Sequence, residues 1–196
     1  MPILESLRQV ENEMFDNHHP LAKEPVAMRE AYAIGYTMLV CVGGYPNEIV
    51  KKQLKREIVA LNLPAKFRKT AIDTAMNANP NVVYHILSVL VKPEHKYIFM
   101  LDLYKSAFRD KKITEQEQEF LLLFERLLEL SADELHFVRG FRLAMLKKNA
   151  ELASKVVQEA ISCSLSVPLQ ELQYFLKSFE HWKHGAQKET DKIETF

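Results

Sequence analysis

The chain has 196 residues, of which 47% are hydrophobic, so it is long enough to bury a core without disulfides or metals. Lysine plus arginine and aspartate plus glutamate number 26 each, which gives a formal net charge of zero. That balance argues against a general nucleic-acid-binding protein, whose surface would be strongly basic. The longest apolar runs are also far too short to cross a bilayer. We therefore expect no nucleic-acid partner and no membrane insertion.

The two cysteines, Cys41 and Cys163, lie in apolar runs and show no Cys-x-x-Cys spacing. Such residues usually behave as small hydrophobic side chains, so we expect buried, reduced thiols rather than a disulfide. The N-terminal sequence lacks the basic region and continuous apolar core of a signal peptide. Together these features predict a cytoplasmic protein.

Apolar residues recur along the chain at spacings of three and four, and Asn-Gly and Asp-Gly hairpin signals do not occur. The pattern predicts an all-α fold, a bundle of antiparallel helical hairpins joined by short connections. We expect about nine helices, the last one broken near residues 166–168: 2–16, 25–42, 47–61, 64–77, 80–91, 94–109, 114–129, 131–148 and 149–182.

Two capping boxes mark helix starts, one from Thr114 to Glu117 and one from Ser131 to Glu134. In each box the hydroxyl can accept from the N3 amide while the carboxylate accepts from the N-cap amide. Four prolines, at positions 64, 80, 93 and 168, lie near the starts of further helices, where a missing N–H costs little. Within 131–148 we expect one apolar stripe to face the core: Leu135, Val138, Phe141, Leu143 and Met145.

The same pattern predicts four parts of the chain. Residues 1–20 form an N-terminal helical arm that ends in a loop at 16–20, and residues 21–93 form an N-terminal helical part. Residues 94–184 form a C-terminal helical part packed on it, and residues 185–196 form a polar, flexible tail.

Motifs for catalysis or cofactor binding do not occur. The sequence contains no Glu-x-x-His, His-Glu-x-x-His, Gly-x-Ser-x-Gly, Walker A or Gly-x-Gly-x-x-Gly pattern. Glu180 and His184 share a helix face, but a histidine at a helix end more often interacts with the last carbonyls than with a metal. We therefore expect a protein that is not an enzyme and that has no resident cofactor.

One segment carries a recognisable motif, residues 101–117, LDLYKSAFRDKKITEQE. The segment contains an expected helix that ends in Ala-x-x-Asp. An isoleucine stands three residues after that aspartate, and a glutamate stands seven residues after it. With the continuation at 127–135, it resembles the signature of the TerB-like proteins, an all-helical bacterial family associated with tellurite resistance. The resemblance covers residues 97–148.

The resemblance implies an acidic site for a divalent cation, formed by Asp110 and Glu117, with Asp102 as a third ligand. Lys111 departs from the family pattern, because it stands where the family usually has glycine. Hard cations prefer several oxygen ligands with little positive charge nearby. The cations at positions 109, 111 and 112 are expected to neutralise Asp110 instead. We therefore expect the site to be weak or lost.

Two functions stay open. The first is a TerB-like protein of tellurite resistance or stress response that acts by binding other proteins. The second is a helical scaffold or adaptor that binds a partner peptide or helix and is unrelated to tellurite. A homodimer is one expected assembly, because Trp182 near the end of its helix could mark a contact surface; packing within the chain is the alternative role for this residue.

Overall fold

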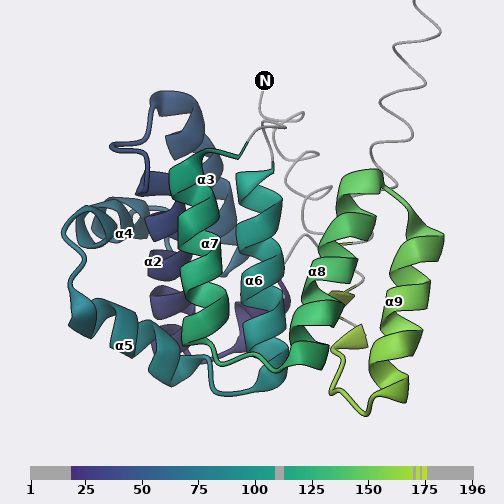
Figure 1. Cartoon of the computed structure of the whole chain (residues 1–196). Coiled ribbons are helices and arrows are strands. Elements are labelled where there is room, and N and C mark those ends of the chain that lie inside the picture. Colours follow the sequence, from purple (N-terminus) through teal and green to yellow (C-terminus); the bar gives the residue numbers. More distant parts are fainter. Residues whose placement is uncertain (1–18, 109–112, 170, 173, 176–196) are drawn as a thin grey trace, which may run out of the picture.

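The computed structural model describes residues 19–108, 113–169, 171, 172, 174 and 175 (Figure 1). Within these residues the chain is all-helical, with eight α-helices, one 3₁₀ helix and no strand. None of these helices is long and apolar enough to cross a membrane. In chain order the elements are η1 (Pro20–Lys23), α2 (Val26–Cys41), α3 (Glu48–Ala60), α4 (Phe67–Met76), α5 (Pro80–Val89), α6 (Pro93–Ala107), α7 (Glu115–Leu127), α8 (Ala132–Lys147) and α9 (Ala150–Ser162).

The helix starts follow the local sequence signals. Thr114 caps α7 and Ser131 caps α8, and both capping boxes form completely, as predicted. Pro80 and Pro93 each occupy the first position of a helix. The predicted helix at 2–16 lies outside the described residues, so the count of nine stays a prediction.

Helices α2 and α6 form the centre of the fold. Each is buried on most of its faces, whereas a surface helix would bury a single stripe. α2 contacts α3, α4, α5, α6 and α7, and α6 also contacts α7 and α8. Gly35 permits the close approach of α2 to its neighbours, because a Cβ at this position would lie 2.8 Å from Cζ of Phe99 and 3.2 Å from Cγ2 of Ile86. Both central helices therefore need small or well-fitted side chains where they meet.

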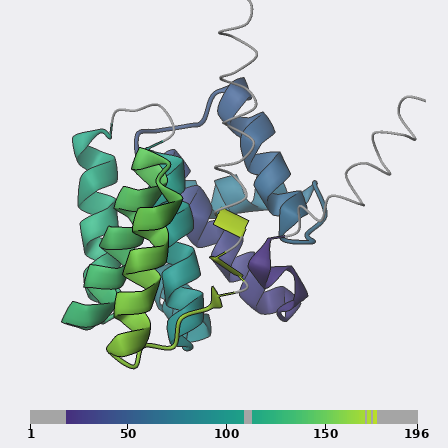
Figure 2. The same cartoon turned by 90° about the vertical axis from the view of Figure 1, so that its right-hand side faces the viewer.

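Helix α9 packs against α8 on the side of the molecule seen face-on in Figure 2. Gly140 of α8 lets the two helices approach, since a Cβ there would lie 3.1 Å from both γ-methyl groups of Val156. In Figure 1, α6 lies between α7 and α8, and it contacts both. The three helices therefore lie side by side on one face of the molecule, with α6 in the middle.

Four helices end with a residue in the left-handed conformation. After three of them the amide of the following residue donates to a carbonyl five residues earlier: from Leu63 to Ile58 (3.1 Å), from Asn149 to Ala144 (3.0 Å) and from Leu165 to Ala160 (3.0 Å). This geometry satisfies carbonyls that would otherwise lack a partner at the helix end. The residues with positive φ are Asn62, Glu129, Lys148 and Ser164.

Several expectations are corrected. The helix predicted at 149–182 ends at Ser162, earlier than the expected break, and helical conformation resumes at Leu169. Cys41 is buried as expected, but Cys163 is exposed, since it follows the last residue of α9. His19 lies in a loop before η1, as expected, but its side chain is buried and caps η1, which the sequence did not predict.

The predicted division at residues 93 and 94 stays a prediction. It falls after the first residue of α6, whose bounds are Pro93–Ala107. However, side chains from both sides of the division form one continuous hydrophobic core. The arm at 1–20 lies outside the described residues apart from its last two, and the tail at 185–196 lies outside them entirely.

Candidate functional site

The residues predicted to hold a cation have three different positions. Asp110 lies outside the described residues. Glu117 accepts hydrogen bonds from the amide and the hydroxyl of Thr114, both at 2.9 Å, so its carboxylate closes the capping box of α7. Asp102 is buried in α6 with 3% of its surface exposed. Within the described part of the chain, no group of three or more His, Cys, Asp or Glu side chains is placed to hold a metal ion.

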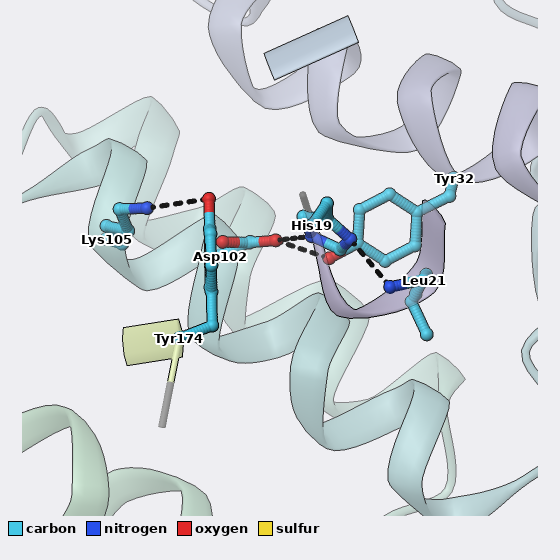
Figure 3. A network of polar contacts seen from close by, with 6 residues as sticks. All are labelled: His19, Leu21, Tyr32, Asp102, Lys105 and Tyr174. Atoms are coloured by element: carbon cyan, nitrogen blue, oxygen red, sulfur yellow. Dashed lines mark hydrogen bonds and ion pairs between the residues drawn. The ribbon is translucent and has the colours of Figure 1, made fainter. Parts of the chain in front are cut away.

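Asp102 belongs to a buried polar cluster that the sequence did not predict (Figure 3). Its Oδ2 atom lies 2.5 Å from Nε2 of His19 and 2.6 Å from the hydroxyl of Tyr32. Nδ1 of His19 accepts from the amide of Leu21 at 3.1 Å, which leaves Nε2 to carry the hydrogen and donate it to Asp102. One carboxylate oxygen thus receives two side-chain donors from different segments.

Two further side chains surround this cluster. The ring of Tyr174 lies 5.5 Å from the ring of His19 in an edge-to-face arrangement. Lys105 donates to the Tyr174 hydroxyl at 3.3 Å, and its ammonium lies 4.6 Å from the centre of that ring. The cluster therefore joins the segment before α2, the central helices α2 and α6, and the segment after α9 (Figure 3).

Opposing effects set the protonation of the cluster. Burial would raise the pKa of Asp102, but His19, Lys105 and Tyr32 together outweigh burial and hold it below its ordinary value. Burial and the adjacent Asp102 raise the pKa of Tyr32, so the phenol keeps its proton and donates it. His19, Tyr32 and Asp102 are each at most 3% exposed, so the cluster is closed to solvent. Its evident effect is to fix four segments together.

A second polar network lies on the face formed by α6, α7 and α8. Glu125 of α7 is buried and accepts two hydrogen bonds from Arg139 of α8, at 2.6 and 3.0 Å, and one from the hydroxyl of Tyr104. Burial would raise the pKa of Glu125, but Arg139 and Tyr104 outweigh it and lower the pKa. The carboxylate therefore stays ionised, and the side chain of Arg139 is still 48% exposed.

Arg142 contacts this network through the ring of Tyr104, and its charge helps to lower the pKa of Glu125. Its guanidinium carbon lies 4.8 Å from the centre of the Tyr104 ring and 5.5 Å from that of Phe108, which is a cation–π arrangement. Its Nε is buried and has no hydrogen-bond partner in the structure. The contact with two rings restricts the position of the guanidinium.

Large apolar side chains are exposed on both α7 and α8. Val138 and Phe141 of the expected core stripe are buried, but Leu143 is 41% exposed, because the buried side of α8 runs through Phe137 and Ala144 rather than through Leu143. The other exposed leucines of α7 and α8 have exposed fractions between 40% and 44%: Leu122, Leu123, Leu127 and Leu146.

Comparison with known proteins adds no relative. No family model matches the chain, and neither a curated protein nor a solved structure is significantly similar to it. The resemblance to TerB-like proteins therefore depends on the motif within residues 97–148 alone.

Proposed function

We propose that this chain is a non-enzymatic binding protein that recognises a segment of another protein through its outer helices α7 and α8. The observation that carries the proposal is that five leucines are exposed on these two helices: Leu122, Leu123, Leu127, Leu143 and Leu146. The ionisable side chains of the two polar networks support a non-enzymatic role. They form hydrogen bonds and ion pairs with one another and thereby stabilise the packing of the helices.

The spacing of the leucines supports a contact surface. Leu123 and Leu127 are four residues apart on α7, and Leu143 and Leu146 are three apart on α8, so the members of each pair are neighbours on their helix. A single exposed leucine is ordinary, whereas grouped apolar side chains often mark an interaction site. Covering them would release about 25 cal/mol for each Å² of apolar surface removed from water.

The test compares co-purifying proteins from the native host for three tagged chains. In the first variant, Leu123, Leu127, Leu143 and Leu146 are replaced by serine. The control variant carries serine at Ile49 and Val91, which are 77% and 70% exposed on other parts of the molecule. We expect the wild type and the control variant to recover a partner protein that the leucine variant does not recover. The purified partner should also bind the purified wild type directly. Equal recovery by all three chains would contradict the proposal.

The physiological setting is a separate part of the proposal. The motif in residues 97–148 supports a role in tellurite resistance or a related stress response. Deleting the gene should then lower growth of the host on tellurite, and the wild-type gene should restore it. Unchanged growth would instead favour an adaptor that is unrelated to tellurite.

A further inference from the structure

We infer that one face of α8 binds an acidic amphipathic segment of the partner protein, with Arg142 as the principal contact for a carboxylate. This inference rests on the proposed binding function and adds the location and the charge of the ligand. The face is called the α8 stripe below and consists of Arg139, Arg142, Leu143, Leu146 and Lys147.

The members of the α8 stripe share one side of the helix. Counted from Arg139, they occupy positions i, i+3, i+4, i+7 and i+8, which is the spacing of a single helical face. The opposite side of α8 is buried and packs on α6 and α9; it includes Phe137, Val138, Phe141 and Ala144. The stripe is therefore the outward face of a helix whose inner side is already covered.

The positive charge of residues 135–149 favours an acidic ligand. Residues 135–149 contain four Lys or Arg and no Asp or Glu, although the chain as a whole is neutral. Arg139 is partly neutralised, because it forms an ion pair with Glu125 at 2.6 Å. Arg142 forms no ion pair within the described residues, and its Nε has no hydrogen-bond acceptor. Because Nε is closed to solvent, a ligand carboxylate would contact the Nη amino groups of Arg142 and complement the local charge.

The geometry favours a peptide over an anionic membrane surface. Leu143 and Leu146 are 41% and 42% exposed, so more than half of the surface of each residue is already covered, which limits how far either can enter a bilayer. Arg142 is held against Tyr104 and Phe108, and a fixed guanidinium suits bidentate contact with a carboxylate. A partner helix with leucines flanked by glutamates would match both the apolar and the charged members of the stripe.

The experiment measures binding of the full chain to two synthetic amphipathic peptides by titration calorimetry. The peptides share one leucine face, and the first has glutamates beside it where the second has glutamines. The wild type should bind the glutamate peptide at least about tenfold more tightly, as expected for one charge-assisted contact, and this preference should shrink at high salt.

Three variants locate the contact. Arg142→Gln should bring the affinity for the glutamate peptide down to that for the glutamine peptide, and Arg142→Lys should give an intermediate value. Leu143→Ser with Leu146→Ser should weaken both peptides. Arg56→Gln is the control, since Arg56 is an exposed arginine on α3. Unchanged melting temperatures establish that each variant is folded.

The outcomes separate this inference from the proposed function. Leucine-dependent binding of both peptides with equal affinity would overturn the inference and leave the proposed function standing. Binding that is unaffected by the leucine variant would overturn both. Two further outcomes would also overturn the inference, because the stripe would then have a different occupant. One is binding of phosphatidylserine vesicles in place of the glutamate peptide. The other is self-association that the leucine variant abolishes.

Discussion

His19 and Asp102 are 83 residues apart in the sequence, yet Nε2 of the histidine lies 2.5 Å from Oδ2 of the aspartate in the centre of the molecule. This contact fixes the segment before α2 to the central helix α6. Tyr32 of α2 donates to the same oxygen, so the aspartate connects three parts of the fold.

Replacing His19 with alanine should therefore destabilise the fold. The change leaves the buried Asp102 with one side-chain donor fewer and removes the acceptor for the Leu21 amide. We expect a loss of about 3 kcal/mol in the free energy of unfolding, measured by urea denaturation. His85→Ala is the control, because His85 is exposed on α5, and it should change the stability by less than about 0.5 kcal/mol. Equal stability of the two variants would show that the buried contact contributes nothing.

The stability should fall in acid. Asp102 and Glu125 both have a pKa below the ordinary value in the folded protein, and both regain the ordinary value when the chain unfolds. Each group therefore contributes stability above the unfolded pKa of about 4, and this contribution is lost as the pH falls through the lower, folded value. The free energy of unfolding, measured between about pH 6 and pH 3, should decline less steeply for Asp102→Asn than for the wild type. An identical slope would contradict the assignment.

Calcium or magnesium at millimolar concentration should change the melting temperature little. Asp102 is buried and accepts from His19 and Tyr32, while Glu117 closes the capping box with Thr114, and in the described part of the chain no three His, Cys, Asp or Glu side chains are placed to hold an ion. An ion at a hundredfold excess over its Kd would stabilise the fold by about 2.7 kcal/mol and raise the melting temperature by several degrees. A rise that Asp110→Asn abolishes would show that the cation site implied by the TerB-like motif is functional.

Gly35→Ala should destabilise the protein although alanine is the better helix former. The new methyl group would lie 2.8 Å from Phe99, whose ring is fully buried and also contacts Tyr32. Overpacking costs about 1–3 kcal/mol and outweighs a gain of about 1 kcal/mol in helix propensity. Gly43→Ala is the matched control, because its nearest neighbour would be 3.8 Å away, and it should be neutral. Thermal unfolding distinguishes the two, and a stabilising Gly35→Ala would contradict the close packing of α2 on α6.

Much of the fold could be predicted because its signals are local. The capping boxes at Thr114 and Ser131 and the prolines at 80 and 93 mark helix starts within a few residues, so the sequence alone identifies them. The apolar periodicity predicted the all-α fold for the same reason.

The polar clusters could not be predicted in this way. His19 follows a loop-like run and precedes Pro20, and nothing near it indicates a partner in α6. Leu143 was expected in the core because it lies close to the apolar stripe of α8, but which of two adjacent faces is covered depends on where α6 and α9 pack. Both cases depend on contacts between segments far apart in the sequence, which periodicity does not encode. The sequence does show that residues 135–149 contain no acidic residue. This indicates a binding surface only once the structure shows which face of α8 points outward.

The most direct test of the binding surface is a map of amide chemical-shift changes in the full chain on addition of the glutamate peptide. We predict that the largest changes lie in α8, at Arg142, Leu143, Leu146 and their immediate neighbours, and that α3 and α4 on the other side of the bundle do not respond (Figure 1). Changes centred on α3 or α4, or no change at saturating peptide, would contradict the assignment of the α8 stripe as the partner-binding surface.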